Sequence, residues 1–434
     1  MHIYFSGIGG AGIGPLAEIA HAAGYEVSGS DKQDSSYIHY LKKHGITDVH
    51  IGQTAKAIAA VHQKKPIDWY VHTSALTLEN PNPPEIVYCK ENGIRVSKRD
   101  ELLNQIITDK KLKMVAVAGT HGKTTTTAMV VWLFKQLDIP VSYTLPAKTS
   151  FADMGHFDPK SEYFVYEADE FDRNFLAFQP HLSLITGVSW DHHEIFPTRE
   201  DYQAAFVEFM TQSDKVVAWQ DDVEYLNFEA RPGDSIVRSD QTQANLMKLK
   251  GLYNRLDARL AIEGVYQLGL VDGKTPKAKW FEVMNKFPGL QRRMEQIAPN
   301  LYSDYAHTPE KIRGAMSVAL EMAAENDQPL VVVYEPLTNR RQHYMMDDYK
   351  DCFAGAEHVY WVPSYLARED PYQYVLPPEE LIAHLDDPSI ASPAKPDAHL
   401  KKQIKKHLDD GAMVVGMAGG GGGSLDDWLR KEFS

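Results

Sequence analysis

The chain has 434 residues, of which 43% are hydrophobic and 24% charged, as is typical of a globular protein with more than one domain. Its formal net charge of −14 argues against a nucleic-acid partner, because a phosphate backbone requires a basic surface. Two cysteines, no signal peptide and no apolar run of membrane-spanning length predict a cytoplasmic protein without disulfides or a membrane partner. Composition leaves open whether it is a monomer or a homodimer.

The first predicted elements form a strand–loop–helix unit. A strand is predicted over residues 2–5, the glycine-rich segment Gly7-Ile8-Gly9-Gly10-Ala11-Gly12 follows, and residues 15–23 are predicted to be helical. Glycines let backbone N–H groups at a helix N-terminus approach an anion. A second strand, 26–30, ends at Asp31, and an acidic residue about 20 positions after such glycines commonly binds a ribose. Taken alone, this unit would predict a nicotinamide-dependent oxidoreductase.

The alternation of strands and helices continues to about residue 110. Residues 69–74 and 94–97 are predicted strands, with helical stretches between them. The sequence Asp-Lys-Lys-Leu-Lys at 109–113 is a charged linker. We therefore expect a first domain over residues 1–110.

A nucleotide-triphosphate loop is predicted directly after this linker. Residues 115–118 predict a buried strand, which breaks at a glycine and leads towards a helix over 128–137. In such a loop a lysine supplies an ammonium group to the outer phosphates, and the next hydroxyl binds Mg²⁺. The first glycine is displaced from its standard position, so the loop is shorter. The residues predicted to bind ATP here are Gly119, Thr120, His121, Gly122, Lys123, Thr124 and Thr125.

Two later segments place acidic and imidazole groups after predicted strands. The apolar run from residue 163 ends in Glu167-Ala168-Asp169-Glu170-Phe171-Asp172, and the run from residue 181 leads to Asp191 and His192. Carboxylates at a strand end beside a phosphate loop suit Mg²⁺. Because parallel strands end at the same edge of a sheet, we expect Glu167 and His192 to reach the phosphate loop.

The segment Gly-Thr-His-Gly-Lys-Thr-Thr-Thr-Thr at 119–127 closely resembles the ATP loop of the Mur ligases. These enzymes join amino acids or peptides to a UDP-sugar carboxylate in bacterial wall (peptidoglycan) synthesis. The resemblance is nearest to the branch that adds L-alanine to UDP-N-acetylmuramate. It implies an α/β fold of three domains, with ATP and Mg²⁺ as cofactors: a Rossmann-like UDP-binding domain over 1–110, a central P-loop ATPase domain over 111–286, and a Rossmann-like C-terminal domain over 287–434.

The resemblance also implies roles for residues of the first two domains. The UDP-substrate site would comprise Gly9, Gly10, Ala11, Gly12, Asp31 and Ser74. The metal ligands would be Thr124, Glu167 and His192, with Asp169, Glu170 and Asp191 further from the metal or acting through water. Other branches carry a carbamylated lysine some fifteen residues past the histidine, whereas residues 202–207 contain none, which again favours the alanine-adding branch.

Further expected roles fall later in the chain, where the family pattern is less complete. Asn254 would contact adenine, Asp304 the ATP ribose, and His307 the phosphates. Arg341 would bind the carboxylate of the incoming amino acid, a geometry that guanidinium suits. Leu252-Tyr253 and Leu337-Thr338 stand where the family has other residues, and the glycines at 419–423 form either a turn or a second anion-binding nest.

The resulting hypothesis is a two-step ligase with Lys123, Glu167, His192 and Arg341 as catalytic residues. The sugar-linked carboxylate would attack the γ-phosphate of ATP, and the amino acid's amine would then attack the acyl phosphate. Three alternatives remain open at this stage: a recycling ligase that attaches a tripeptide to UDP-N-acetylmuramate, a nicotinamide-dependent oxidoreductase, and a non-catalytic binding protein on a Mur-ligase scaffold.

Overall fold

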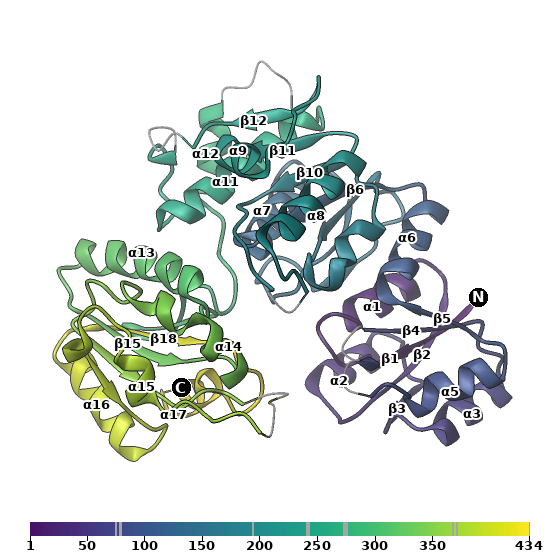
Figure 1. The fold of residues 1–434 in the computed structure, drawn as a ribbon. Helices are drawn as coiled ribbons and strands as arrows, with labels where there is room; N and C mark the ends of the chain where they lie inside the picture. Colours follow the sequence, from purple (N-terminus) through teal and green to yellow (C-terminus); the bar gives the residue numbers. More distant parts are fainter. Residues whose placement is uncertain are drawn as a thin grey trace. The chain divides into compact units, whose positions relative to one another are not determined.

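A computed structural model describes residues 1–73, 76–77, 80–192, 195–239, 244–271, 277–366, 369 and 372–433. The chain forms two compact units, one of Met1–Leu246 with Leu256–Pro288 and the other of Met247–Arg255 with Gly289–Ser434. Three sheets flanked by helices are present, so the predicted α/β class is confirmed (Figure 1). No helix of the described residues is long and apolar enough to cross a membrane.

The first sheet is wholly parallel, and its strand order is that of the first five strands of a doubly wound, dinucleotide-binding sheet. Its strands, in spatial order, are β3 (Val49–Ile51), β2 (Glu26–Asp31), β1 (His2–Ser6), β4 (Trp69–His72) and β5 (Arg95–Lys98). The described helices that follow or connect them are α1 (Gly14–Ala22), α2 (Ser36–Lys43), α3 (Ala55–Lys64), α5 (Pro84–Glu91) and α6 (Arg99–Asp109).

Strand β1 shows why this sheet folds as it does. Successive side chains of a strand point to opposite faces. Ile3 and Phe5 join one apolar cluster, and Tyr4 joins another on the opposite face. Both faces are therefore buried, which explains the continuous apolar run in the sequence.

The second sheet carries the predicted phosphate loop. Its strands, in spatial order, are β12 (Ser235–Val237), β11 (Val216–Trp219), β10 (Leu182–Ile185), β6 (Lys113–Ala118), β9 (Tyr163–Glu167), β7 (Val141–Thr144) and β8 (Gly155–His156). Only the pairing of β8 with β7 is antiparallel among these described strands. The elements around it are α7 (Lys123–Gln136), the 3-10 helix η1 (Phe171–Ala177), α8 (Arg199–Gln212), α9 (Gln220–Leu226), α11 (Leu252–Gln267) and α12 (Lys277–Met284).

The first and second sheets share one apolar core within the first unit. A single cluster of buried side chains includes Ile3 of β1, Leu102 of α6 and Ala116 of β6. Contacts between α1 and β8 and between α6 and η1 join the same two layers. The predicted linker at 109–113 is the short passage from the end of α6 to the start of β6. A domain boundary near residue 110 stays a prediction.

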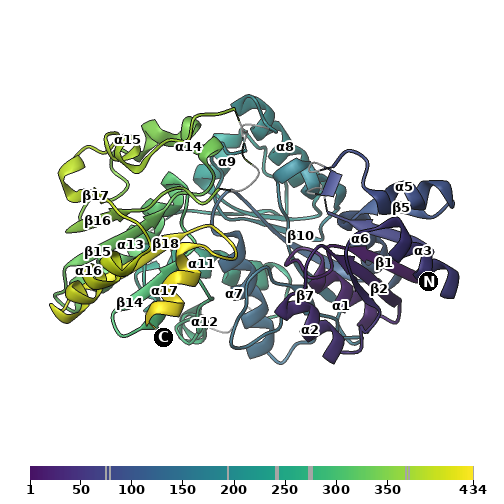
Figure 2. The same cartoon turned by 90° about the horizontal axis from the view of Figure 1, so that it is seen from below.

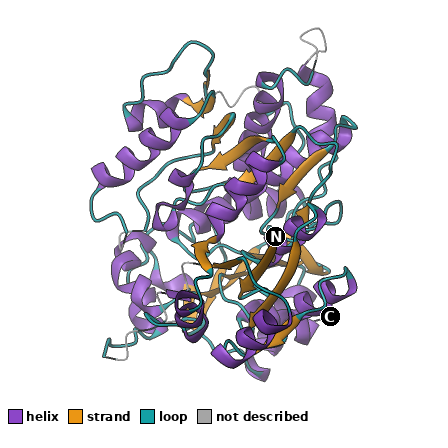
Figure 3. Ribbon diagram, turned by 90° about the vertical axis from the view of Figure 1, so that its right-hand side faces the viewer, coloured by secondary structure: helices purple, strands orange, loops and turns teal. Residues whose placement is uncertain are grey.

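The third sheet forms the core of the second unit. Its strands, in spatial order, are β13 (Glu295–Ala298), β14 (Leu301–Asp304), β18 (Met413–Ala418), β15 (Leu330–Glu335), β16 (His358–Trp361) and β17 (Ala391–Pro393), with β13 antiparallel to β14 (Figure 2). Its helices are α13 (Pro309–Glu325), α14 (Asn339–Met345), η2 (Met346–Tyr349), α15 (Pro378–Ile382), η3 (Pro388–Ile390), α16 (Ala398–Asp409) and α17 (Leu425–Phe433), and Figure 3 shows helices beside the strands.

Helices pack on both faces of this third sheet. Val331 and Val333 of β15 pack with α16 and α17, whereas Val332 and Tyr334 pack with α13 on the opposite face. Both faces of β15 are therefore dry, which requires the unbroken apolar sequence at 330–334. Pro309 occupies the first position of α13, where proline is favoured because it has no N–H to leave unpaired.

Candidate active site

The phosphate loop lies at the carboxyl end of the central strand of the second sheet. Strand β6 pairs in parallel with β9 on one side and β10 on the other. Glu167 is the last residue of β9, opposite Val117, and the segment after β10 leads to His192. The two strands are consecutive in the described fold but are not neighbours in space. They flank the loop strand, so their ends bracket the loop.

Two glycines give the loop its shape. Gly119 has φ +145° and Gly122 has φ +73°, backbone conformations that other residues rarely adopt. A Cβ on Gly119 would lie 2.4 Å from Oγ1 of Thr186, and one on Gly122 would lie 2.5 Å from Oδ1 of Asp257. Helix α7 begins at Lys123, directly after the loop. Its positive dipole end therefore faces the space that a phosphate would fill.

The side chains of Thr120 and His121 hold the loop in place. The Thr120 hydroxyl lies 2.7 Å from the Tyr202 hydroxyl and 2.7 Å from the Ser189 carbonyl oxygen, and it accepts a hydrogen bond from the Ser189 N–H at 2.9 Å. The His121 ring nitrogen Nε2 lies 2.7 Å from the Ser189 hydroxyl. These contacts stabilise the loop, and direct ATP contacts by these two residues stay a prediction. Thr124 and Thr125 occupy the first turn of α7.

Lys123 is paired with a buried carboxylate. Its Nζ donates hydrogen bonds to Glu170 at 2.7 and 3.0 Å and to the Gly119 carbonyl oxygen at 2.6 Å. The Glu170 side chain is 1% exposed. Burial alone would raise the pKa of Glu170, but Lys123 and then His192 outweigh it and lower that pKa to about 2. The pair is therefore fully charged at neutral pH.

The same carboxylate approaches His192. Nε2 of His192 lies 3.6 Å from Oε1 of Glu170, and the ring packs edge-on against Phe171 with centroids 5.2 Å apart. His192 has φ +54°, an uncommon conformation that turns the chain back after Asp191. Lysine, glutamate and imidazole thus meet around the Glu170 carboxylate.

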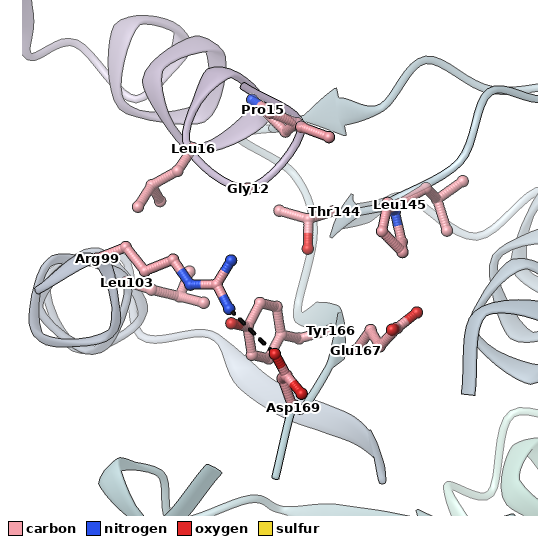
Figure 4. A pocket seen from close by; sticks show the side chains of 12 residues that line it. Gly12, Pro15, Leu16, Arg99, Leu103, Thr144, Leu145, Tyr166, Glu167 and Asp169 are labelled. Carbon is pink, nitrogen blue, oxygen red and sulfur yellow. Dashed lines mark ion pairs between the residues drawn. The ribbon is translucent and has the colours of Figure 1, made fainter. Parts of the chain in front are cut away.

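Glu167 lies a short distance away, in a cavity of about 160 Å³. Asp169 and Arg99 line the same cavity, together with Gly12 of the glycine-rich loop (Figure 4). Segments of the first and second sheets therefore share one enclosure. This is the geometry needed if a ligand held by the first sheet is to reach the phosphate loop of the second.

The predicted metal ligands fit an ion that is shared with phosphates. In the described part of the chain, no three His, Cys, Asp or Glu side chains gather into a ready-made metal site. Mg²⁺ is normally held by one or two carboxylates, with substrate phosphates and water completing the octahedron. The side chains beside the loop offer such an incomplete set of protein ligands: Thr124, Glu167 and His192. Their role as ligands stays a prediction.

Asp31, the last residue of β2, contacts the backbone of the glycine-rich loop. Its Oδ2 accepts a hydrogen bond from the Gly9 N–H at 2.8 Å. The Gly10 N–H donates to the Gly7 carbonyl oxygen at 2.9 Å, and Ala11 and Gly12 are exposed beside the cavity. Oδ2 of Asp31 thus shapes the loop, while Oδ1 accepts a longer hydrogen bond from the Gln33 N–H at 3.4 Å, and the contact of Asp31 with a ribose stays a prediction. Ser74, also predicted here, lies outside the described residues.

Asp304 and His307 lie in a buried loop at the carboxyl end of β14 in the second unit. Asp304 accepts hydrogen bonds from the backbone N–H groups of Met294 and Ala306, both at 2.9 Å. Nδ1 of His307 lies 2.7 Å from the Tyr305 carbonyl oxygen. Burial, followed by the positive charge of neighbouring side chains, lowers the pKa of His307 well below its usual range. His307 is thus a neutral imidazole held in a cationic environment.

Arg341 is one of the charges that act on His307, and it lies on α14. A Cβ on Gly419, the first residue of the glycine run, would lie 2.5 Å from Cγ of His307, so the run passes close to that ring. The side chain of Asn254 donates to the Lys250 carbonyl oxygen at 2.8 Å. Asn254 also belongs to the second unit, although the predicted boundaries assign it to the central domain.

The comparison with known proteins agrees with this arrangement. The family model described as "Mur ligase family, catalytic domain" matches residues 2–111, and "Mur ligase middle domain" matches residues 117–261. The chain belongs to the Mur ligase family. The two matched regions hold the two nucleotide-type loops, so a Mur ligase accounts for both, whereas an oxidoreductase accounts for only the first.

Individual relatives resemble this Mur ligase along most of its length. The UDP-N-acetylmuramate–L-alanine ligase of Clostridium acetobutylicum is 28% identical over 402 residues, covering 85% of this chain and 84% of the relative. The crystal structure of UDP-N-acetylmuramate–alanine ligase from Thermotoga maritima has a TM-score of 0.74 at 23% identity, covering 100% and 98% of the two chains. A murein peptide ligase from Psychrobacter arcticus has a TM-score of 0.65 at 22% identity, covering 100% and 98%. The two structural likenesses concern the fold.

Two features of this site are not predicted from the sequence. The sequence places Glu170 further from the metal or linked to it through water, and it does not predict the direct contact of Glu170 with Lys123. Arg99 was not singled out at all. A usable signal existed for Arg99, because it follows a parallel strand of a doubly wound sheet, and ligands bind beyond the carboxyl ends of such strands.

Proposed function

We propose that this Mur ligase uses ATP to join L-alanine to UDP-N-acetylmuramate. Relatives that bear the name of that activity resemble the chain over 85% of its length, as with the Clostridium acetobutylicum protein.

One observation carries the proposal: Gly12 and Glu167 line the same cavity (Figure 4). A ligase of this kind must bring a carboxylate of a nucleotide-sugar to the γ-phosphate of ATP. A glycine-rich loop on the first sheet and a phosphate loop on the second, joined by one enclosure, supply the two binding surfaces. Holding both reactants in one place contributes several kcal/mol towards the barrier.

In the first step, the sugar-linked carboxylate attacks the γ-phosphate, and ADP leaves. The Lys123 ammonium group and the N–H groups at the start of α7 would stabilise the charge that develops on the transferring phosphoryl group. Mg²⁺, when bound at Thr124, Glu167 and His192, would neutralise further phosphate charge. Lys123 must leave Glu170 at least in part to do this, because its Nζ is held at 2.7 Å there.

In the second step, the free amine of the amino acid attacks the acyl carbon and phosphate leaves. Arg341 would hold the amino acid's carboxylate, since guanidinium matches a carboxylate with two parallel hydrogen bonds. His307, neutral within a cationic loop, would contact the phosphates of ATP as a hydrogen-bonding group rather than as a charge.

The decisive experiment measures phosphate release from ATP by the purified chain with UDP-N-acetylmuramate and each amino acid in turn. L-alanine is expected to give the highest kcat/KM. UDP-N-acetylglucosamine is the matched control substrate, because it lacks the carboxylate that must be phosphorylated, and it should give no release. Preference for the L-alanyl-γ-D-glutamyl-diaminopimelate tripeptide would indicate the recycling ligase instead. No release with any acceptor would refute the proposal and favour a binding protein.

A further inference from the structure

Arg99 places a guanidinium group in the shared cavity. It is the first residue of α6, directly after β5 ends at Lys98. Its side chain is 23% exposed and points from the first sheet towards Asp169 of the second (Figure 4).

The guanidinium group has unused hydrogen-bonding capacity. Its nearest charged partners are Oδ1 of Asp100, 3.5 Å from Nε, and Oδ2 of Asp169, 3.8 Å from Nη2. Both distances are long for a hydrogen bond between charged groups, which is typically about 2.7–2.9 Å. Among the residues that the structure describes, Arg99 donates no hydrogen bond. A guanidinium group carries five N–H donors, and such a group in a half-closed cavity is well suited to an anionic ligand.

The guanidinium lies directly against the glycine-rich loop. A Cβ on Gly12 would lie 2.6 Å from Nη1 of Arg99, which shows how closely the guanidinium group approaches the loop backbone. Gly12 lies two residues before the start of α1 at Gly14, and the N–H groups at that helix N-terminus favour a negative charge. An anion on the loop would therefore meet the helix terminus on one side and Arg99 on the other.

We propose that Arg99 binds the diphosphate of the UDP-sugar, a contact that rests on the function proposed above. Nη1 faces the loop while Nη2 faces Asp169, so the guanidinium stands between the diphosphate and the carboxylates of the second sheet. It offsets a repulsion that Asp169 and Glu167 would otherwise exert across a cavity of about 160 Å³. Arg99 thus couples binding of the nucleotide-sugar to the acidic edge where phosphoryl transfer would occur.

Calorimetric titration without Mg²⁺ or ATP tests this contact. UDP, UDP-N-acetylglucosamine and UDP-N-acetylmuramate are titrated into the wild type, Arg99→Met and Arg99→Lys. Arg99→Met is expected to weaken all three by a similar factor, about tenfold to a hundredfold, because a charge-assisted pair is lost. Arg99→Lys keeps the charge beside Asp100, so it protects folding, and it should give a smaller loss because lysine lacks the fork of donors.

Arg95→Met is the matched control. Arg95 lies on β5 and pairs with Glu101 at 3.5 Å, but its side chain is 50% exposed and does not line the cavity. Arg95→Met removes one positive charge, as Arg99→Met does, and should leave the affinities for all three ligands within about twofold of the wild-type values. Affinities of Arg99→Met within that same range would overturn the proposal. A loss seen only with UDP-N-acetylmuramate would also overturn it, by assigning Arg99 to the sugar's carboxylate. A wild type that binds no UDP ligand would refute the proposed function itself.

Discussion

Replacing Glu170 by glutamine removes the charge at the centre of the phosphate loop and keeps its shape. Glu170 is 1% exposed and Lys123 is 14% exposed, so the pair is screened little by water. Glutamine would leave the Lys123 ammonium group buried without its counter-charge. Breaking a buried ion pair from one side typically costs about 3–5 kcal/mol, because the remaining charge is desolvated and unpaired.

The pKa of Glu170 gives the same order of magnitude. It falls from 4.5 to about 2 in the folded protein, and at about 1.4 kcal/mol per unit this corresponds to about 3 kcal/mol of stabilisation. Because the pKa of this carboxylate is lower in the folded protein, Glu170 stabilises the fold at pH values above 4.5, its pKa in the unfolded chain. That stabilisation is lost as the pH falls from 4.5 towards 2. Between pH 5 and 8, the destabilisation caused by Glu170→Gln should therefore be constant, at about 3 kcal/mol.

Urea unfolding, followed by circular dichroism in metal- and nucleotide-free buffer, measures this difference. Glu162→Gln provides the matched control, because Glu162 also pairs with a lysine, Lys113, at 2.6 Å, but at the surface with 58% exposure. An exposed pair contributes about 0–1 kcal/mol, so the control should be nearly neutral. If both variants lose the same small amount, the buried pair does not stabilise the loop and the reasoning is refuted.

Three further predictions concern activity and pH. Lys123→Ala should lower the rate of ATP-dependent phosphate release at least about a hundredfold. Lys113→Ala, at the start of strand β6 before the loop, should stay within about twofold of the wild type, and equal rates for the two variants would show that the loop takes no part in catalysis. Glu167→Ala should abolish most turnover at any Mg²⁺ concentration, and His192→Ala should reduce turnover less; a metal titration showing the opposite ranking would contradict the assignment of these two residues as metal ligands. Mn²⁺ should sustain turnover by the wild type, because it accepts nitrogen ligands more readily than Mg²⁺ does. Burial raises the pKa of Asp222 from 3.8 to about 7, so between these pH values only the unfolded chain ionises at this position and the wild type loses stability as the pH rises. In thermal unfolding, the free energy of unfolding of Asp222→Asn should therefore gain up to about 4 kcal/mol relative to the wild type between pH 4 and pH 8, whereas parallel curves of stability against pH would show that this carboxyl group is not perturbed.

The sheets could be predicted because their strands are buried on both faces. Residues 330–334 and 115–118 are continuous apolar runs, and a strand packed on two sides requires such a run. The phosphate loop was predictable for a different reason. Its glycines at 119 and 122 adopt positive φ, which few other residues tolerate, so the presence of glycine at these positions predicts the loop conformation.

The acidic segment shows where local sequence stops being informative. Glu167, Asp169 and Glu170 are close in sequence, and composition alone does not tell which of them turns back to Lys123. That choice depends on the chain after β9, which enters η1 with Asp172 and Arg173 at φ +55° and +54°. Neither residue is a glycine, so the residue types at these positions do not predict the turn. Packing of η1 against α6 and α8 decides it instead.

Strand order limits prediction in a second way. The segments ending at Glu167 and leading to His192 follow one another among the described strands, and a sequence argument naturally places them side by side. In the sheet they are separated by β6, so the two groups approach the phosphate loop from opposite sides. Arg99 reaches Asp169 across 70 positions of sequence, from another sheet altogether. A motif therefore identifies which residues lie at the reactive edge, whereas the order of strands decides which of them meet. For this chain, packing of α1 and α6 against β8 and η1 brings the glycine-rich loop and the acidic edge into the lining of one cavity, which is the arrangement a carboxylate-activating ligase needs.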